Sequence, residues 1–163
     1  MGTIADQYTE ASLIYRYSPL KGKDFMAAWL QHLILNRQTG EHITHLISQD
    51  EYLSFLPEHI QGDELEKLLA YYHLGQKQPD AFFTEAAFAY IKQQAALNAP
   101  GSRSRVPALA KAETELSESI AKNYEAELSL LYKNLEDVDD LLNDEFEAYC
   151  LQLLLPAWEA VSV

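Results

Sequence analysis

The chain has 163 residues, of which 48% are hydrophobic and 23% charged, and these proportions exclude a disordered or fibrous protein. A chain of this length can bury a sizeable core, so we expect a single domain over residues 1–163. Its 25 acidic residues against 12 basic ones give a net charge of −13, which excludes a broad phosphate-binding surface. Any contact with nucleic acid must therefore be local or belong to a larger assembly.

The first elements predicted along the chain are strands and one helix. Thr3–Tyr8 and Ser12–Ser18 form a predicted hairpin, because apolar and aromatic residues alternate in the second run. From Gly22 to Gln38 apolar residues recur three and four apart, which indicates a core helix that ends at Gly40. His42–Ser48 is then a predicted third strand.

Helices dominate the rest of the prediction. Residues 52–60 form an extended or irregular passage, after which Asp63 and Glu66 have the spacing of an acidic capping box. The helix that they begin ends at Gly75, and Thr84 caps the next one.

A stretch rich in Pro, Gly and Ser, about residues 98–108, predicts a flexible loop. Beyond it lies another helical pattern, and a last helix runs from about Asp139 to Leu155, where Pro156 stops it. The order of elements predicts an α+β fold, with a small, mostly antiparallel sheet followed by a helical carboxy-terminal half.

The compartment follows from absences in the sequence. The single cysteine, Cys150, excludes an intramolecular disulfide and is typical of a reducing compartment. No stretch reaches the ~18 to 20 apolar residues of a membrane span, and no signal peptide is recognisable. A phosphate-binding loop of the Walker type is also missing, so we expect no ATP site and no cofactor. We therefore expect a cytoplasmic protein without a membrane partner.

The stretch LIYRYSPLKGKD and the following AAWLQHLILN resemble the carboxy-terminal domain of RecC. The resemblance extends to GTIADQY and to the closing LQLLLPAWEAV, and it is densest from Leu13 to Leu35. RecC is the gamma subunit of exodeoxyribonuclease V, an ATP-dependent helicase and nuclease complex of double-strand-break repair and recombination. The resemblance implies a terminal fragment of a longer protein, with Met1 as an added start and Val163 as the native end.

The same resemblance implies a degenerate PD-(D/E)XK nuclease core, similar to that of restriction endonucleases. An active core of this kind has an acid, one residue and then a lysine on one strand, and these help to hold magnesium. The resemblance places Tyr15 at the acid position and Tyr17 at the lysine position. No lysine of the chain has an acid two residues before it. Because a neutral phenol does not supply the charge that a hard cation requires, we expect no metal site and no catalytic residue.

The resemblance therefore implies a noncatalytic role, in assembly with the RecB and RecD subunits and in splitting the strands of duplex DNA ends. Local basic residues are the candidates for DNA contact, with solvated charge as the alternative reading. Adjacent aromatic residues cannot all face a core, so some are candidates for a partner interface. The DNA candidates are Arg16, Lys21, Lys23, Arg103 and Arg105, and the interface candidates are Tyr71, Phe82 and Phe83.

Two other functions stay open. One is an active magnesium-dependent nuclease of the same fold, and the other is a stand-alone, acidic helical adaptor that binds proteins. His42 and His45 lie three apart on a predicted strand, hence on opposite faces, which is a poor metal pair. A fragment of a sheet leaves an unpaired edge, so we also expect the isolated chain to form a homodimer.

Overall fold

The computed structural model describes residues 8, 11–60, 62–77, 82–122 and 138–162. The chain groups into two compact units, the first made of residues 1–79 and 152–163 and the second of residues 80–151. Whether they form one folding domain, as expected for residues 1–163, stays a prediction. No helix within the described parts of the chain is long and apolar enough to cross a membrane.

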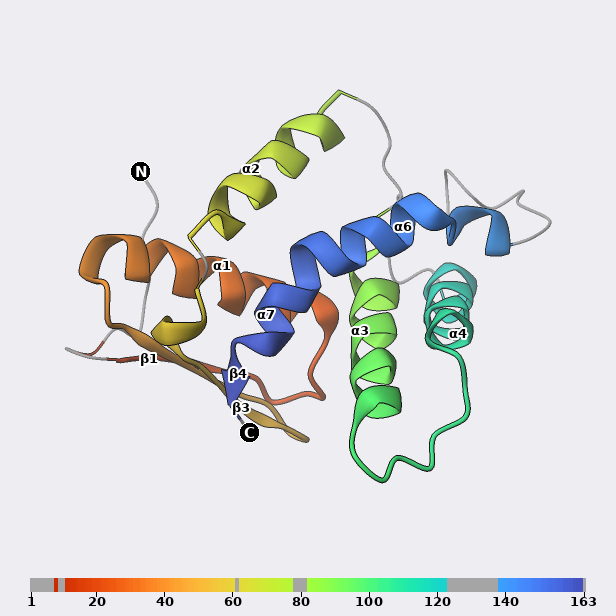
Figure 1. Cartoon of the computed structure of the whole chain (residues 1–163), viewed down its shortest axis with the longest axis horizontal. Coiled ribbons are helices and arrows are strands. Elements are labelled where there is room, and N and C mark those ends of the chain that lie inside the picture. The colour runs from red at the N-terminus through yellow and green to blue at the C-terminus, as the bar shows by residue number, and fades with distance from the viewer. Residues whose placement is uncertain (1–7, 9–10, 61, 78–81, 123–137, 163) are drawn as a thin grey trace. The chain divides into compact units, whose positions relative to one another are not determined.

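A small mixed sheet organises the first unit (Figure 1). Its strands lie side by side in the order β1 (Ala11–Tyr15), β2 (Ile43–Ile47), β3 (Tyr52–Phe55) and the two-residue β4 (Val161–Ser162). β2 is parallel to β1 and antiparallel to β3, and β4 pairs antiparallel with β3. With the helices described below, this sheet confirms the predicted α+β class.

Helix α1 (Gly22–Thr39) connects the parallel strands β1 and β2 and covers one face of the sheet (Figure 1). Phe25 and Trp29 are fully buried, and their rings lie 5.3 and 5.7 Å from the ring of Phe55 on β3. The helix ends as predicted at Gly40, whose φ of 82° is the left-handed conformation that glycine adopts without strain. The apolar periodicity thus located this helix to within one residue at each end.

The strands differ more from the prediction. Of the hairpin's first strand, Thr3–Tyr8, all but the last residue lie outside the described residues. The second strand is β1, which ends at Tyr15 instead of Ser18. Residues 52–60, predicted as an extended or irregular passage, form the extended strand β3 and then a 3₁₀ turn, Pro57–His59, but the prediction did not assign the strand. Leu53 and Phe55 are buried, and β3 is held between β2 and β4.

Helix α2 (Glu64–Gly75) ends at the predicted glycine, but its predicted capping box is wrong. The side chain of Asp63 makes no capping hydrogen bond, and its carboxylate lies 2.8 Å from the Lys67 ammonium. The carboxylate of Glu66 instead pairs with the guanidinium of Arg37 on α1. Both acids are thus engaged by cations, Asp63 by Lys67 four residues further along the same helix and Glu66 by Arg37 on another helix.

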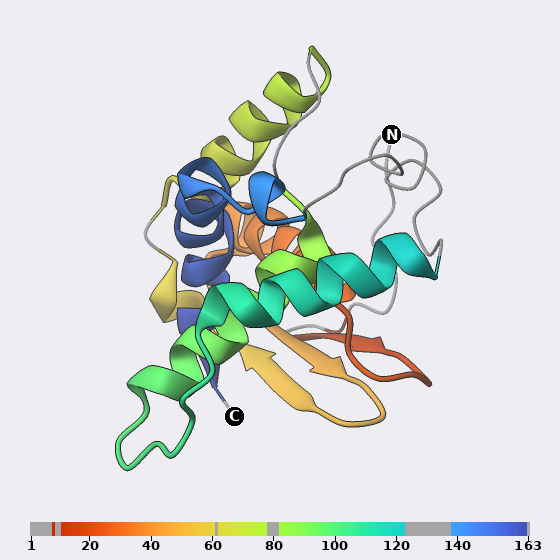
Figure 2. The same cartoon turned by 90° about the vertical axis from the view of Figure 1, so that its right-hand side faces the viewer.

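The second unit is helical. Helices α3 (Thr84–Asn98) and α4 (Ala108–Ala121) pack side by side (Figure 2), and residues 99–107 connect them where a loop was predicted. The flexibility of that loop stays a prediction. Thr84 is the first residue of α3 and makes no capping hydrogen bond, so its predicted role as a cap is wrong.

The predicted last helix is divided into several short elements. A 3₁₀ turn (Asp139–Leu141) is followed by α6 (Asp144–Tyr149), a π-helical turn (Cys150–Leu154) and α7 (Leu155–Glu159). Asn143 caps α6, since its side chain accepts hydrogen bonds from the backbone N–H groups of Glu145 and Phe146. Pro156 does not stop the helix as predicted. It lies in the first turn of α7, where a missing N–H costs nothing.

Candidate functional site at the end of strand β1

The two predicted degenerate positions lie on the surface at the end of β1. Tyr15 is the last residue of the strand and is 57% exposed, while Tyr17 is 93% exposed. Their rings meet edge to face, with centroids 5.8 Å apart and planes at 82°. The backbone N–H of Arg16 between them donates to the carbonyl of Ile47 over 2.8 Å, which ties this end of the chain to β2.

The register extends this aromatic surface across the sheet. Tyr15 lies beside Ile47 on β2, which lies beside Tyr52 on β3, and all three side chains are exposed. The ring of Tyr52 stacks on His45 with centroids 5.9 Å apart, and its hydroxyl lies 3.0 Å from His45 Nδ1. Ile47, Tyr52 and His45 were missed as site residues because β3 was not recognised. With that strand, the period-2 pattern places them beside Tyr15.

The carboxylates near this end of the sheet already have structural partners. Asp24 Oδ1 lies 3.1 Å from Arg16 Nη2, and the side chain of Asp24 is only 11% exposed. Asp50 Oδ1 accepts hydrogen bonds from the Leu20 N–H over 2.8 Å and from the Ser48 hydroxyl over 2.7 Å. Among the residues that the structure describes, no three His, Cys, Asp or Glu side chains are grouped closely enough to hold a metal ion.

Three of the five basic candidates gather at the start of α1. Lys21 precedes the helix, Lys23 lies in its first turn, and Arg16 reaches that turn through Asp24. Both lysines are exposed, whereas Arg16 is 44% exposed and partly occupied by the ion pair. The other two candidates, Arg103 and Arg105, are exposed in the α3–α4 connection and belong to the second unit.

The aromatic interface candidates differ in exposure. Tyr71 on α2 and Phe82 are half-buried, whereas Phe83 is buried in the second unit with its ring centroid 6.5 Å from that of Phe146. Tyr72, beside Tyr71, is 60% exposed. The two members of each adjacent pair thus differ in exposure, and the interface role of Tyr71, Phe82 and Phe83 stays a prediction.

A buried polar network lies beneath the sheet, on the face covered by α1. The Ser12 hydroxyl donates to Thr44 Oγ1 over 3.2 Å, and Thr44 Oγ1 lies 3.1 Å from His32 Nδ1. Burial lowers the pKa of His32 to about 4, against the opposing effect of a hydrogen bond with the Leu56 backbone. His32 is therefore neutral near pH 7 and joins α1 to the parallel strands. Burial also lowers the pKa of His42.

The fold and this site define an α+β protein whose strand-to-helix junction carries exposed tyrosines and an internally neutralised aspartate. Residues 1–95 match the model of one protein family, the RecC C-terminal domain. The chain belongs to this family. The match includes the strands β1 to β3 with α1 and α2, but it does not reach LQLLLPAWEAV, where the resemblance was also expected. A search of curated proteins found no match.

Proposed function

We propose that the chain is a noncatalytic part of a RecC subunit of exodeoxyribonuclease V. In this role it acts in DNA repair and recombination, by assembling with the RecB and RecD subunits and by helping to split the strands of duplex ends. Membership of the RecC C-terminal domain family supports the subunit assignment. The observation that carries the noncatalytic assignment is the pair of exposed phenols, Tyr15 and Tyr17, at the end of β1.

The chemistry of that strand end supports the loss of hydrolysis in a degenerate PD-(D/E)XK core. A catalytic magnesium ion is held by anionic oxygens, and near pH 7 a tyrosine is neutral and a weak ligand. The carboxylate of Asp24 is paired with the guanidinium of Arg16, so an ion at that carboxylate would have to displace a resident cation. The site thus combines neutral rings with an acid that is already compensated.

The same surface suits contact with DNA in the assembled complex. Exposed aromatic rings stack on unpaired bases, and lysines beside them bind phosphates without regard to sequence. Tyr15, Tyr17 and Tyr52 supply the rings, and Lys21 and Lys23 supply the cations. Because the whole chain carries a net charge of −13, the remaining positive field has to come from other subunits.

A nuclease assay tests the noncatalytic assignment. We expect the purified chain to leave linear and supercoiled DNA intact in magnesium or manganese, even at high protein concentration. Metal-dependent degradation that follows the protein through purification would instead establish the alternative of an active nuclease. A crystal soaked in manganese is the matching structural test, since a bound ion beside Tyr15 would contradict the proposal.

Capture of RecB and RecD from the same organism tests the assembly role. We expect the immobilised chain to retain at least one of the two subunits. A stable monomer that binds neither would favour the alternative of a stand-alone acidic adaptor.

The expected homodimer concerns the isolated chain. Among the strands that the structure describes, β1 has a neighbour on only one side, so its other edge is open to pairing. We expect light scattering to report a dimer, and a monomer at all concentrations would contradict this expectation.

A further inference from the structure

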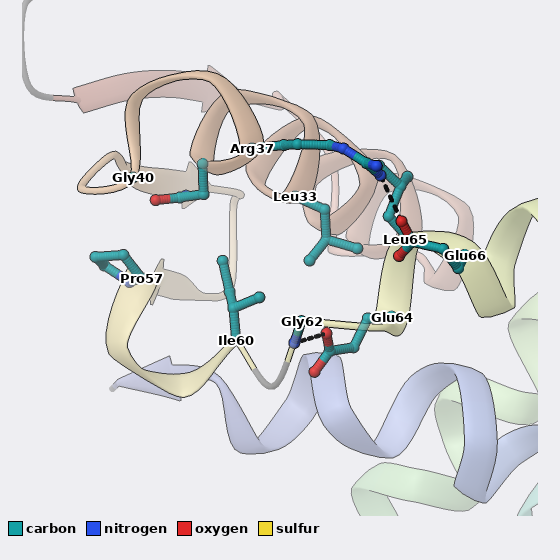
Figure 3. A pocket seen from close by; sticks show the side chains of 10 residues that line it. Leu33, Arg37, Gly40, Pro57, Ile60, Gly62, Glu64, Leu65 and Glu66 are labelled. Carbon is teal, nitrogen blue, oxygen red and sulfur yellow. Dashed lines mark hydrogen bonds and ion pairs between the residues drawn. The ribbon is translucent and has the colours of Figure 1, made fainter.

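A groove lies in the first unit between the carboxy-terminal half of α1 and the segment that leads into α2 (Figure 3). It has a volume of about 360 Å³, and we call it the α1–α2 groove. Leu33 from one side and Ile60 from the other point toward each other inside it (Figure 3). Pro57 and Leu65 add further apolar surface, so the floor of the groove suits an apolar side chain.

One wall of the groove is acidic. This wall and its immediate flank, residues 57–60 and 62–67, contain four carboxylates and one lysine, Lys67, which pairs with Asp63. Glu64 is buried and accepts a hydrogen bond from the Gly62 N–H over 2.8 Å, whereas Glu58 and Asp63 are exposed at the surface. The opposite wall contributes one cation, Arg37, which is already paired with Glu66 (Figure 3).

An exposed apolar stripe continues the groove along α2. Leu65 lines the groove, and Leu69 and Tyr72 follow it four and seven residues later, which places all three on one helix face. Leu69 is 47% exposed and Tyr72 is 60% exposed. The groove and the stripe together form an extended apolar surface beside an acidic wall.

We propose that the α1–α2 groove and its stripe bind a basic amphipathic segment of a partner protein. Apolar side chains of that segment enter between Leu33 and Ile60 and continue over Leu69, while its lysines or arginines face the carboxylates of the wall. The inference rests on the proposed assembly role, to which it adds a surface and a class of partner.

Charge complementarity selects this occupant over two others. The wall's carboxylates repel the phosphates of a nucleic acid, which removes the main source of its affinity. A second copy of the chain would bring the same acidic wall against this one, and like charges across an interface oppose binding.

Nuclear magnetic resonance with a defined probe tests the proposal. The probe is a synthetic helical peptide of leucine and lysine, about four turns long, with leucines three and four residues apart. Added to the full 163-residue chain, it should shift the signals of Leu33, Ile60, Gly62 and Leu65 first. A matched peptide with glutamate in place of lysine should not bind. Shifts scattered over other acidic surfaces, or none at all, would overturn the proposal.

Two double variants distinguish the effect of charge at the acidic wall from the effect of the net charge of the chain. Glu58→Lys combined with Asp63→Asn should weaken the binding of the leucine–lysine peptide by about tenfold, because it removes exposed negative charge beside the groove and frees the Lys67 ammonium from its partner. The matched control is Glu113→Lys with Glu115→Gln, which changes two exposed carboxylates of α4 by the same charge. Equal weakening by both variants would overturn the proposal, since it would mean that only net charge matters.

A second pair of variants tests the apolar floor. Leu65→Ala should reduce the affinity for the same peptide, whereas Leu30→Ala, at an exposed position of α1 outside the groove, should not. The spectrum of each variant without peptide shows whether the variant is folded. A loss of affinity counts only for a variant whose spectrum matches that of the unaltered chain. Unchanged affinity in a folded Leu65→Ala chain would overturn the proposal.

The capture of RecB and RecD distinguishes failure of this inference from failure of the proposed function. One outcome is that the unaltered chain and the double variant Glu58→Lys with Asp63→Asn retain a subunit equally well. In that case the assembly role stands and the proposed binding at the groove is overturned. If the chain retains neither subunit, the proposed function fails, and the peptide titration still decides whether the groove binds basic amphipathic segments.

Discussion

The buried histidine on α1 makes the stability of the first unit depend on pH. His32 is fully buried, with its Nδ1 against Thr44, and burial lowers its pKa from 6.5 to about 4. In the unfolded chain the imidazole of His32 titrates near pH 6.5. Between pH 6.5 and 4 the unfolded state therefore binds a proton that the folded state does not bind. Stability is therefore fully present above about pH 6.5 and falls as the pH is lowered toward 4.

The expected magnitude follows from the two pKa values. Each pH unit between them corresponds to ~1.4 kcal/mol, which gives a total of about 3 kcal/mol below pH 4. About 2 kcal/mol of this should already be lost between pH 7 and pH 5, where few carboxylates titrate. Loss of that size is a large fraction of the stability of an ordinary domain.

Urea unfolding followed by tryptophan fluorescence measures this loss. Both tryptophans, Trp29 and Trp158, belong to the first unit, so the signal reports on the part of the chain that contains His32. His32→Gln keeps hydrogen-bonding groups but cannot titrate, so it should lose about 2 kcal/mol less than the unaltered chain between pH 7 and pH 5. The exposed His59→Gln is the control. An equal pH dependence in the unaltered chain and His32→Gln would refute the reasoning.

Three further substitutions have expected outcomes that urea unfolding can check. Arg16→Ala should lower the free energy of unfolding by ~1 to 3 kcal/mol, because it leaves the nearly buried Asp24 carboxylate without its cation. Adding Asp24→Asn should recover most of this loss, and no recovery would contradict the pairing. Tyr90→Phe should cost ~1 to 3 kcal/mol by removing the 2.7 Å hydrogen bond to Glu147. Burial, followed by that bond, raises the pKa of Tyr90, so its phenol should stay protonated at pH 10, as ultraviolet absorbance compared with Tyr90→Phe will report. Tyr17→Ala should change the free energy of unfolding by less than ~0.5 kcal/mol, and a larger loss would mean that its edge-to-face contact with Tyr15 stabilises the fold.

Local periodicity predicted the helix of the core well and the strands less well. For α1 the apolar residues recur at helical spacing over many turns and Gly40 marks the end, so the local signal agrees with the tertiary structure. β3 has only four residues, of which Leu53 and Phe55 face the core, and the nearby Pro57 suggests a break. It is a strand because β2 and β4 pair with it, and β4 comes from the far end of the chain.

For the candidate site, too, the sequence predicted some residues and missed others. Tyr15 and Tyr17 were found from the sequence because they lie in one short continuous stretch that carries the resemblance, although Tyr17 lies beyond the end of β1. The partners of Arg16 and Glu66 were not, since Asp24 lies beyond the bend that follows β1 and Arg37 lies on another helix. In the predicted capping box, Asp63 instead pairs with Lys67 four residues along the same helix, and Glu66 pairs with the distant Arg37.

The pairing of β4 with β3 determines when the first unit can be completed as the protein is made. Its residues come from both ends of the chain, and the closing segment places Trp158 5.9 Å from Phe25 and lets the Ala160 carbonyl accept from the Leu56 N–H. The second unit is one continuous stretch that leaves the ribosome earlier, so it can finish its core first. Until residues 161–162 have been synthesised, β3 lacks its second neighbour, and its open edge can pair with another chain.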